Sequence, residues 1–191
     1  MADLTALPAR VEAFAGLSPL DHGSRFAATP LAPATRLVFR GCEAAIEAAT
    51  AAFGVGLPRI ACRAAEAADR AALWLGPDEW LLVAPDGEGE AIAAAFRAIA
   101  APHSLVDVSH RNTGLDLTGT EVAAVLNAGC PLDLHLTAFP VGMCTRTLFA
   151  KAEIVLWRRA VDRFRLECWR SFAPYVHGVL ADAALDRSAA E

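Results

Sequence analysis

The chain has 191 residues, of which 17 are Lys or Arg and 22 are Asp or Glu, so its formal net charge is −5. This length suits one domain, or one domain with an arm, and can bury a core without disulfide staples. Lys151 is the only lysine and basic residues form no long run. This composition excludes nonspecific binding to nucleic acid or to an anionic membrane surface.

Hydrophobic residues make up 55% of the chain, and many of them are alanines. Two interpretations stay open: a helix-rich, alanine-biased composition, or apolar surface that a partner covers. The start of the sequence lacks the basic and apolar regions of a signal peptide, and no uncharged apolar run reaches the ~18 residues of a membrane span. We therefore expect a cytoplasmic protein without membrane contact.

The five cysteines are odd in number, and no two lie within four residues of each other. This spacing argues against a disulfide framework or a zinc knuckle and predicts buried free thiols.

Residues 1–35 contain four prolines, which disfavour helices and central strands. They predict an extended N-terminal arm. Its apolar residues, among them Leu4, Phe14 and Phe26, favour an arm that wraps a neighbour over a disordered tail.

The next elements follow from hydrophobic periodicity and from turn residues. A strand is predicted at 36–40 and a helix at 42–53, whose buried face would hold Ala45, Ile46, Ala49 and Phe53. Strands at 59–64, 71–76 and 80–84 and a helix from 86 to about 100 complete the first half.

The same pattern then begins again. Strands are predicted at 104–108, 114–118, 145–149, 153–158 and 164–169, and helices at 120–127, with Thr120 as N-cap, and at 172–184. Gly41 and Gly119 are 78 positions apart, whereas Trp74 and Trp157 are 83 apart, and the longer second-half loop 131–141 accounts for the drift. We therefore predict one α+β domain over 36–184, with halves of about 36–103 and 104–184 related by a pseudo-twofold, and a tail at 185–191. Chance similarity between two α+β segments is the alternative.

No catalytic or metal-binding set stands out. Asp107, Ser109 and His110 are too close in sequence for a nucleophile, base and orienter, so they are interpreted as residues that fix a turn. The five histidines lack metal-ligand spacing. The stretch 86–90 is rich in glycine, but its three carboxylates would repel a phosphate.

Arginines and tryptophans gather in the second half, a composition typical of an interface hot spot. The alternatives are a solvated sheet face paired with Glu153 and Glu167, or a site for a small anion. The predicted interface residues are Arg146, Trp157, Arg163, Arg165, Trp169, Arg170 and Tyr175.

Several stretches together resemble the gamma subunit of heterotetrameric sarcosine oxidase. They are Leu-Trp-Leu-Gly-Pro-Asp-Glu-Trp-Leu-Leu from Leu73, Val-Asp-Val-Ser-His-Arg-Asn-Thr-Gly-Leu from Val106, Leu-Asn-Ala-Gly-Cys-Pro-Leu-Asp-Leu from Leu126, Phe-Pro-Val-Gly-Met-Cys-Thr-Arg-Thr from Phe139, and Trp-Arg-Ser-Phe-Ala-Pro-Tyr-Val from Trp169. The resemblance covers about residues 36–182.

The resemblance implies a fold related to the folate-binding domain of aminomethyltransferases, which is built of two ferredoxin-like halves. It also implies a complex that oxidatively demethylates sarcosine to glycine and passes the methyl carbon to tetrahydrofolate or releases formaldehyde. FAD, FMN, NAD and zinc would belong to the alpha, beta and delta subunits, and this chain would be a non-catalytic assembly subunit.

Two departures bear on folate chemistry. The aminomethyltransferases have an acidic pair before the strand that corresponds to 154–157, whereas Lys151-Ala-Glu-Ile has one carboxylate. The stretch from Gly142 also departs from the motif of the folate proteins that repair iron–sulfur clusters. A stand-alone folate-binding or one-carbon-transfer protein is the alternative function, and a module for another small anion is a third.

Overall fold

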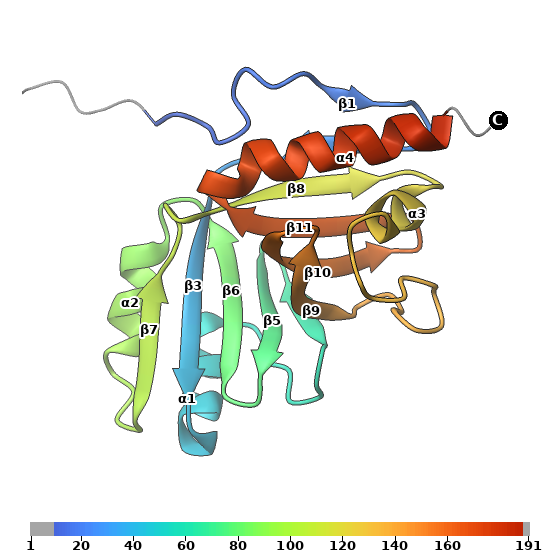
Figure 1. The fold of residues 1–191 in the computed structure, drawn as a ribbon. Coiled ribbons are helices and arrows are strands. Elements are labelled where there is room, and N and C mark those ends of the chain that lie inside the picture. Colours follow the sequence, from blue (N-terminus) through green and yellow to red (C-terminus); the bar gives the residue numbers. More distant parts are fainter. Residues whose placement is uncertain (1–9, 189–191) are drawn as a thin grey trace, which may run out of the picture.

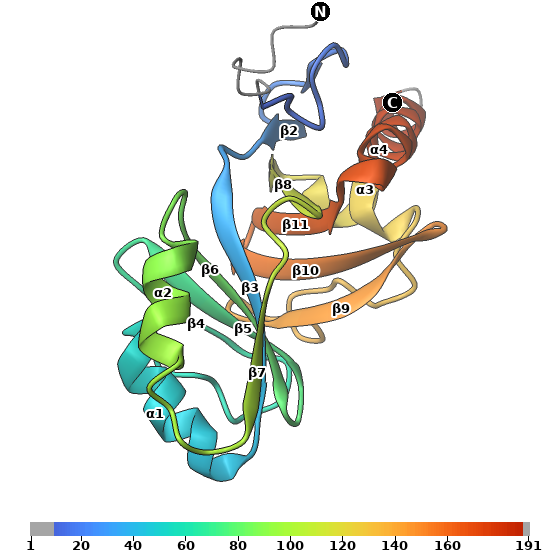
Figure 2. The same ribbon diagram turned by 90° about the vertical axis from the view of Figure 1, so that its left-hand side faces the viewer.

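The computed structural model describes residues 10–188, which form two antiparallel sheets whose strands cross at a steep angle (Figure 1). The first sheet has the strand order β4-β5-β6-β3-β7, and the second has the order β1-β2-β8-β11-β10-β9. Each sheet has helices on its outer face, and the inner faces meet (Figure 2).

The first half supplies four strands of the first sheet and its helices. Its elements are β3 (Ala34–Gly41), α1 (Glu43–Phe53), β4 (Ala64–Ala67), β5 (Arg70–Gly76), β6 (Glu79–Pro85) and α2 (Gly89–Phe96). The fifth strand of that sheet is β7 (His103–Asp107), which lies at the start of the second half. The predicted apolar face of α1 is buried, and the helix ends where Gly54, with a φ of 81°, donates its N–H to the carbonyl of Thr50.

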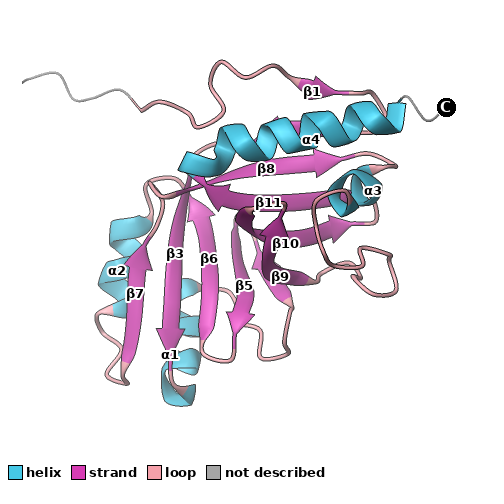
Figure 3. Ribbon diagram, in the orientation of Figure 1, coloured by secondary structure: helices cyan, strands magenta, loops and turns pink. Residues whose placement is uncertain are grey.

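The second half repeats this order. Its elements are β8 (Asn112–Thr118), α3 (Val122–Asn127), β9 (Cys144–Phe149), β10 (Ala152–Ala160), β11 (Arg163–Trp169), a 3₁₀ turn (Arg170–Phe172) and α4 (Ala173–Ser188). The four strands β9-β10-β11-β8 follow the same spatial order as β4-β5-β6-β3 (Figure 3). The α+β class and the repeated strand–helix–strand–hairpin–helix order are as predicted.

The two halves exchange their fifth strand. β7 precedes β8 along the chain but pairs with β3, whereas β2 (Ala27–Pro30) precedes β3 but pairs with β8. Each half therefore completes the sheet of the other, which ties the halves together by backbone hydrogen bonds.

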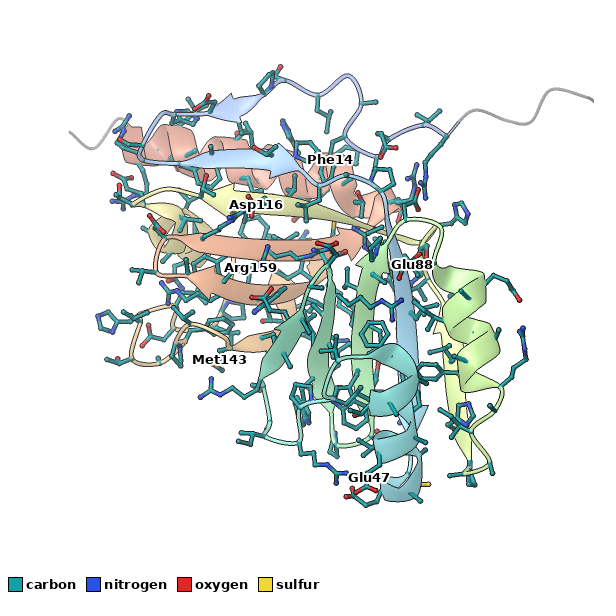
Figure 4. All side chains as sticks on the ribbon, turned by 180° about the vertical axis from the view of Figure 1, so that it is seen from behind. Phe14, Glu47, Glu88, Asp116, Met143 and Arg159 are labelled. Atoms are coloured by element: carbon teal, nitrogen blue, oxygen red, sulfur yellow. The ribbon has the colours of Figure 1, made fainter. Side chains whose placement is uncertain are left out.

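The arm differs from its prediction because it contains strands. Besides β2 it forms β1 (Leu20–Asp21), and the side chains of Phe14, Leu20 and Phe26 are buried in the core of the second half. Figure 4 labels Phe14. These residues pack against their own chain, so the hypothesis that they wrap a neighbour is wrong. Pro30 is accommodated at the end of β2, because β1 pairs only with Ala27 and Ala28 and leaves that side of Pro30 an unpaired edge. The predicted arm residue Leu4 lies outside the described residues.

Three local predictions also need correction. The predicted strand 59–64 is mostly a turn, in which Cys62 has a φ of 57°, and the strand begins only at Ala64. Thr120 is not the N-cap of α3, because Glu121 holds that position and the Thr120 hydroxyl lies toward the carbonyl of Ser24. The helix expected from 86 to about 100 is limited to α2.

Candidate subunit interface

The inner face of the second sheet carries five of the seven predicted interface residues; Arg170 and Tyr175 lie in the 3₁₀ turn and in α4. The register places Arg146, Val155, Glu167 and Gly114 in one row across β9, β10, β11 and β8. The next row contains Cys144, Trp157, Arg165 and Asp116. Beyond these rows lie Leu148 and Glu153 on one side and Arg163 with Thr118 on the other.

The middle of this face is closed by the first sheet. Val155 and Trp157 pack in one buried cluster with Leu73, Leu81 and Val83. A cavity of about 20 Å³ remains beside Val155 and Glu167, and another of about 210 Å³ lies beside Trp157 and Arg165. Both are below the roughly 300 Å³ of a small-molecule site. Trp157 is 3% exposed, so it stabilises the junction of the halves and offers no side-chain surface to a partner.

A buried ion cluster links the halves at the same junction. Arg36 of β3 donates from Nε to Glu167 Oε2 over 2.6 Å, and Arg165 donates from Nη2 to Glu167 Oε1, also over 2.6 Å. The side chains of Arg36 and Glu167 are 3% and 1% exposed. Arg165 therefore stabilises the junction. A residue larger than glycine is disfavoured at position 114, because a Cβ there would lie 2.9 Å from Glu167 Oε1.

Trp169, by contrast, is 39% exposed at the end of β11. The Arg111 guanidinium carbon lies 5.3 Å from the centroid of the Trp169 ring, and the Phe172 ring lies 6.1 Å from it. Arg170 donates its backbone N–H to the carbonyl of Arg111. We call these residues, with the equally exposed Tyr175 of α4, the aromatic–arginine patch: Arg111, Trp169, Arg170, Phe172 and Tyr175.

The patch continues onto β9 and β10. Trp169, Arg111, Glu153 and Arg146 line one shallow depression, and the hydroxyl of Tyr175 accepts a hydrogen bond from the backbone N–H of Lys151 over 3.3 Å. Arg146 bonds Glu79 and lies 4.0 Å from Glu153, so its charge is already matched. Of the predicted interface residues, the structure thus groups Arg146, Trp169, Arg170 and Tyr175 at one surface.

Arg163 lies apart from this surface, beyond the closed junction. It forms a bidentate ion pair with Asp116, whose carboxylate raises the pKa of the Arg163 guanidinium above its ordinary value (Figure 4 labels Asp116). Arg163 thus lies on a solvated, ion-paired sheet face, although its partner is Asp116 and not the predicted Glu153 or Glu167.

Sequence reasoning missed Arg111 and Phe172. Arg111 directly follows the residues that fix the turn at 107–110, and its backbone hydrogen bond with Arg170 joins two segments far apart in the sequence. Only the pairing of β8 with β11, which places Asn112 opposite Trp169, shows that Arg111 lies beside Trp169.

The residues that suggested a catalytic triad have structural roles. Ser109 donates its backbone N–H to Asp107 Oδ1, and its hydroxyl accepts the backbone N–H of Arg36. All five cysteines are free, and burial raises the pKa of the Cys144 and Cys168 thiols to about 12. Within residues 10–188, no group of three or more His, Cys, Asp or Glu is arranged to hold a metal ion. No helix in that range is long and apolar enough to cross a membrane.

The duplicated α+β architecture defines the class of fold to which the chain belongs. The aminomethyltransferase T of the glycine cleavage system from Bartonella henselae shares it, with a TM-score of 0.60 at 16% identity over 82% of this chain and 46% of that chain. The chain belongs to the sarcosine oxidase gamma subunit family, whose profile matches residues 40–186.

Individual relatives agree. The chain is 40% identical to a sarcosine oxidase subunit gamma from Arthrobacter sp. over 58% of this chain and 55% of the relative. It is 35% identical to the corresponding subunit from Corynebacterium sp. strain U-96 over 75% of this chain and 71% of the relative. A chain of the solved heterotetrameric sarcosine oxidase from Corynebacterium sp. U-96, in complex with pyrrole 2-carboxylate, superposes with a TM-score of 0.86 at 31% identity. That match covers 95% of this chain and 98% of the solved chain. The matched region thus spans little more than half of the Arthrobacter relative's length.

Proposed function

We propose that the chain is the gamma subunit of a heterotetrameric sarcosine oxidase and that its role is assembly. In this proposal the complex demethylates sarcosine oxidatively to glycine, and the methyl carbon passes to tetrahydrofolate or leaves as formaldehyde. The alpha, beta and delta subunits carry FAD, FMN, NAD and zinc. The observation that supports an assembly role is the aromatic–arginine patch, which presents Trp169, Tyr175 and Arg111 together on the surface.

The chemistry of the patch suits a protein partner. Trp, Tyr and Arg dominate the binding energy of protein interfaces, because large flat side chains bury much area with few rotatable bonds. Arg111 stacks on Trp169 and bonds the Asn112 amide oxygen, and no carboxylate of residues 10–188 pairs with it. A partner with an acidic side chain at this point would gain an ion pair partly shielded from water.

The junction of the halves supports a non-catalytic assignment. Glu167 is engaged by Arg36 and Arg165, and the cavities beside this cluster, of about 20 and 210 Å³, are smaller than a typical small-molecule site. The five free thiols fit a reducing compartment, and we propose that the complex is cytoplasmic.

Co-expression of the tagged full-length chain with the alpha, beta and delta subunits tests the proposal. The wild-type chain should co-purify with them, and Trp169→Ala should weaken association by roughly 30-fold, the effect of a typical hot-spot residue. Ile60→Ala is the matched control, since Ile60 is 72% exposed and lies outside the patch. A wild-type chain that stays alone would contradict the proposal.

Titration of the isolated chain with tetrahydrofolate tests the alternative. Because both cavities at the junction are small, no binding is expected at high micromolar ligand. Saturable binding would favour a folate-binding protein instead.

A further inference from the structure

The outer edge of β9 has backbone groups that no neighbouring strand of the described residues uses. β9 is the last strand of the second sheet, and β10 pairs with only one of its sides (Figure 2). On the other side, an isolated bridge between Arg63 and Met143, which Figure 4 labels, covers the start of the strand. There Cys144 donates its N–H to the carbonyl of Cys62 over 3.0 Å.

The alternation of an antiparallel strand identifies the free groups. Successive residues direct their N–H and C=O alternately toward and away from the paired strand. Because the N–H of Cys144 points away from β10, those of Arg146 and Leu148 do so as well. Arg146 and Leu148 thus direct their backbone N–H donors and C=O acceptors outward, in a row along the free edge of β9.

This edge has few of the features that usually block pairing, of which the inward-pointing charge of Arg146 is one. β9 contains no proline and no lysine, and its register with β10 has no bulge. Leu148 is an exposed apolar side chain, 49% accessible, and the Glu79 carboxylate already neutralises Arg146. The edge is therefore open to an added strand.

We propose that an extended segment of a larger subunit adds to the β9 edge as a further strand of the second sheet. This inference rests on the proposed function and names the mode by which the partner docks. Alternating N–H and C=O groups are complemented by an extended backbone, and Leu148 requires an apolar side chain beside it. Leu148 pairs with Glu153, which borders the depression that Trp169 lines, so edge and patch form one continuous surface.

A second copy of this chain is the other candidate occupant. Because Glu79 already pairs with Arg146, charge alone does not exclude the pairing of two β9 edges. The continuity of the edge with the aromatic–arginine patch favours another subunit, and the oligomeric state of the isolated chain tests the second copy.

A proline substitution separates backbone pairing from side-chain contact. In Leu148→Pro the lost N–H faces away from β10, so the fold keeps its own hydrogen bonds. Association of the full-length chain with the co-expressed subunits should weaken about tenfold or more, because a hydrogen bond is lost and the ring obstructs the added strand. Leu148→Ala, which keeps the N–H, should weaken association clearly less.

The outcomes distinguish the two proposals. If the wild-type chain and Leu148→Pro associate equally well, the strand addition is wrong while the proposed function stands; if the wild-type chain does not associate, the proposed function fails. An isolated chain that dimerises, and that Leu148→Pro renders monomeric, would assign the edge to a second copy. Should the proline variant misfold, amide exchange of wild-type Leu148 decides: it should slow at least tenfold in the complex, and unchanged exchange would overturn the inference.

Discussion

Glu167 is the carboxylate on which the junction of the two halves depends, and Glu167→Gln is the perturbation that tests this. Glu167 accepts hydrogen bonds from Arg36 Nε and Nη2 at 2.6 and 3.3 Å and from Arg165 Nε and Nη2 at 2.8 and 2.6 Å. The substitution removes the charge, turns an amide group toward guanidinium donors and leaves Arg36, which is 3% exposed, without a counter-ion.

The expected cost follows from that burial. Removing one partner of a buried ion pair destabilises a protein by about 3–5 kcal/mol, because the remaining charge stays desolvated. For a chain of this size each kcal/mol lowers Tm by about 2–4 °C, so a decrease of roughly 6–20 °C is expected. Glu66→Gln is the matched control, since the Glu66–Arg159 pair has side chains 51% and 33% exposed and should contribute at most ~1 kcal/mol.

Urea denaturation of the purified chain measures both variants, and a double-mutant cycle with Arg36→Met isolates the coupling. The cost of Arg36→Met should be much smaller in the Glu167→Gln background than in the wild type. A Glu167→Gln variant within 1 kcal/mol of the wild type, or a cycle without coupling, would refute the assigned role.

Three further perturbations have expected outcomes. Gly119→Ala should destabilise the protein by several kcal/mol, because Gly119 has a φ of 125° and a Cβ there would collide with a backbone carbonyl of the arm. Gly178→Ala is the control: its Cβ would meet open space within α4, so it should be neutral or stabilising by up to ~1 kcal/mol. Thermal melts compare the two variants. Phe26→Ala should cost about 3–5 kcal/mol in urea denaturation, since Phe26 is 1% exposed; a near-neutral result would mean that the arm is dispensable for the fold. Burial raises the pKa of Cys144 and Cys168 from 9.0 to about 12, so the stability that their protonated thiols contribute is complete below pH 9 and is lost as pH rises toward 12. A variant with both cysteines changed to Ala should therefore lose stability less steeply above pH 9 than the wild type. An unchanged slope would contradict this.

The duplication was predictable from the sequence because each half repeats the same order of apolar strands and amphipathic helices. The spacing of Trp74 and Trp157, which occupy corresponding central strands, carried that signal. The exchange of β2 and β7 was not predictable, because hydrophobic patterns mark strands without specifying which strand lies beside them. The strand β2 was not predicted because the prolines of the arm disfavour strands in general.

The interface was predicted only in part. Trp169 and Tyr175 were identified by residue type, and the structure places both at the surface. Trp157 and Arg165 have the same composition but lie at the junction, where the crossing of the two sheets buries them. Alternation along β11 puts Arg165 and Trp169 on one face, yet only the position of the first sheet decides which of them a partner can reach.

The mass of the assembled complex tests the central claim most directly. Native mass spectrometry of the chain co-expressed with alpha, beta and delta subunits should show one heterotetramer that contains this chain once, and the Trp169→Ala variant should shift the population toward complexes that lack it. A wild-type chain found only as a monomer or homo-oligomer beside an assembled complex of the other three would contradict the account.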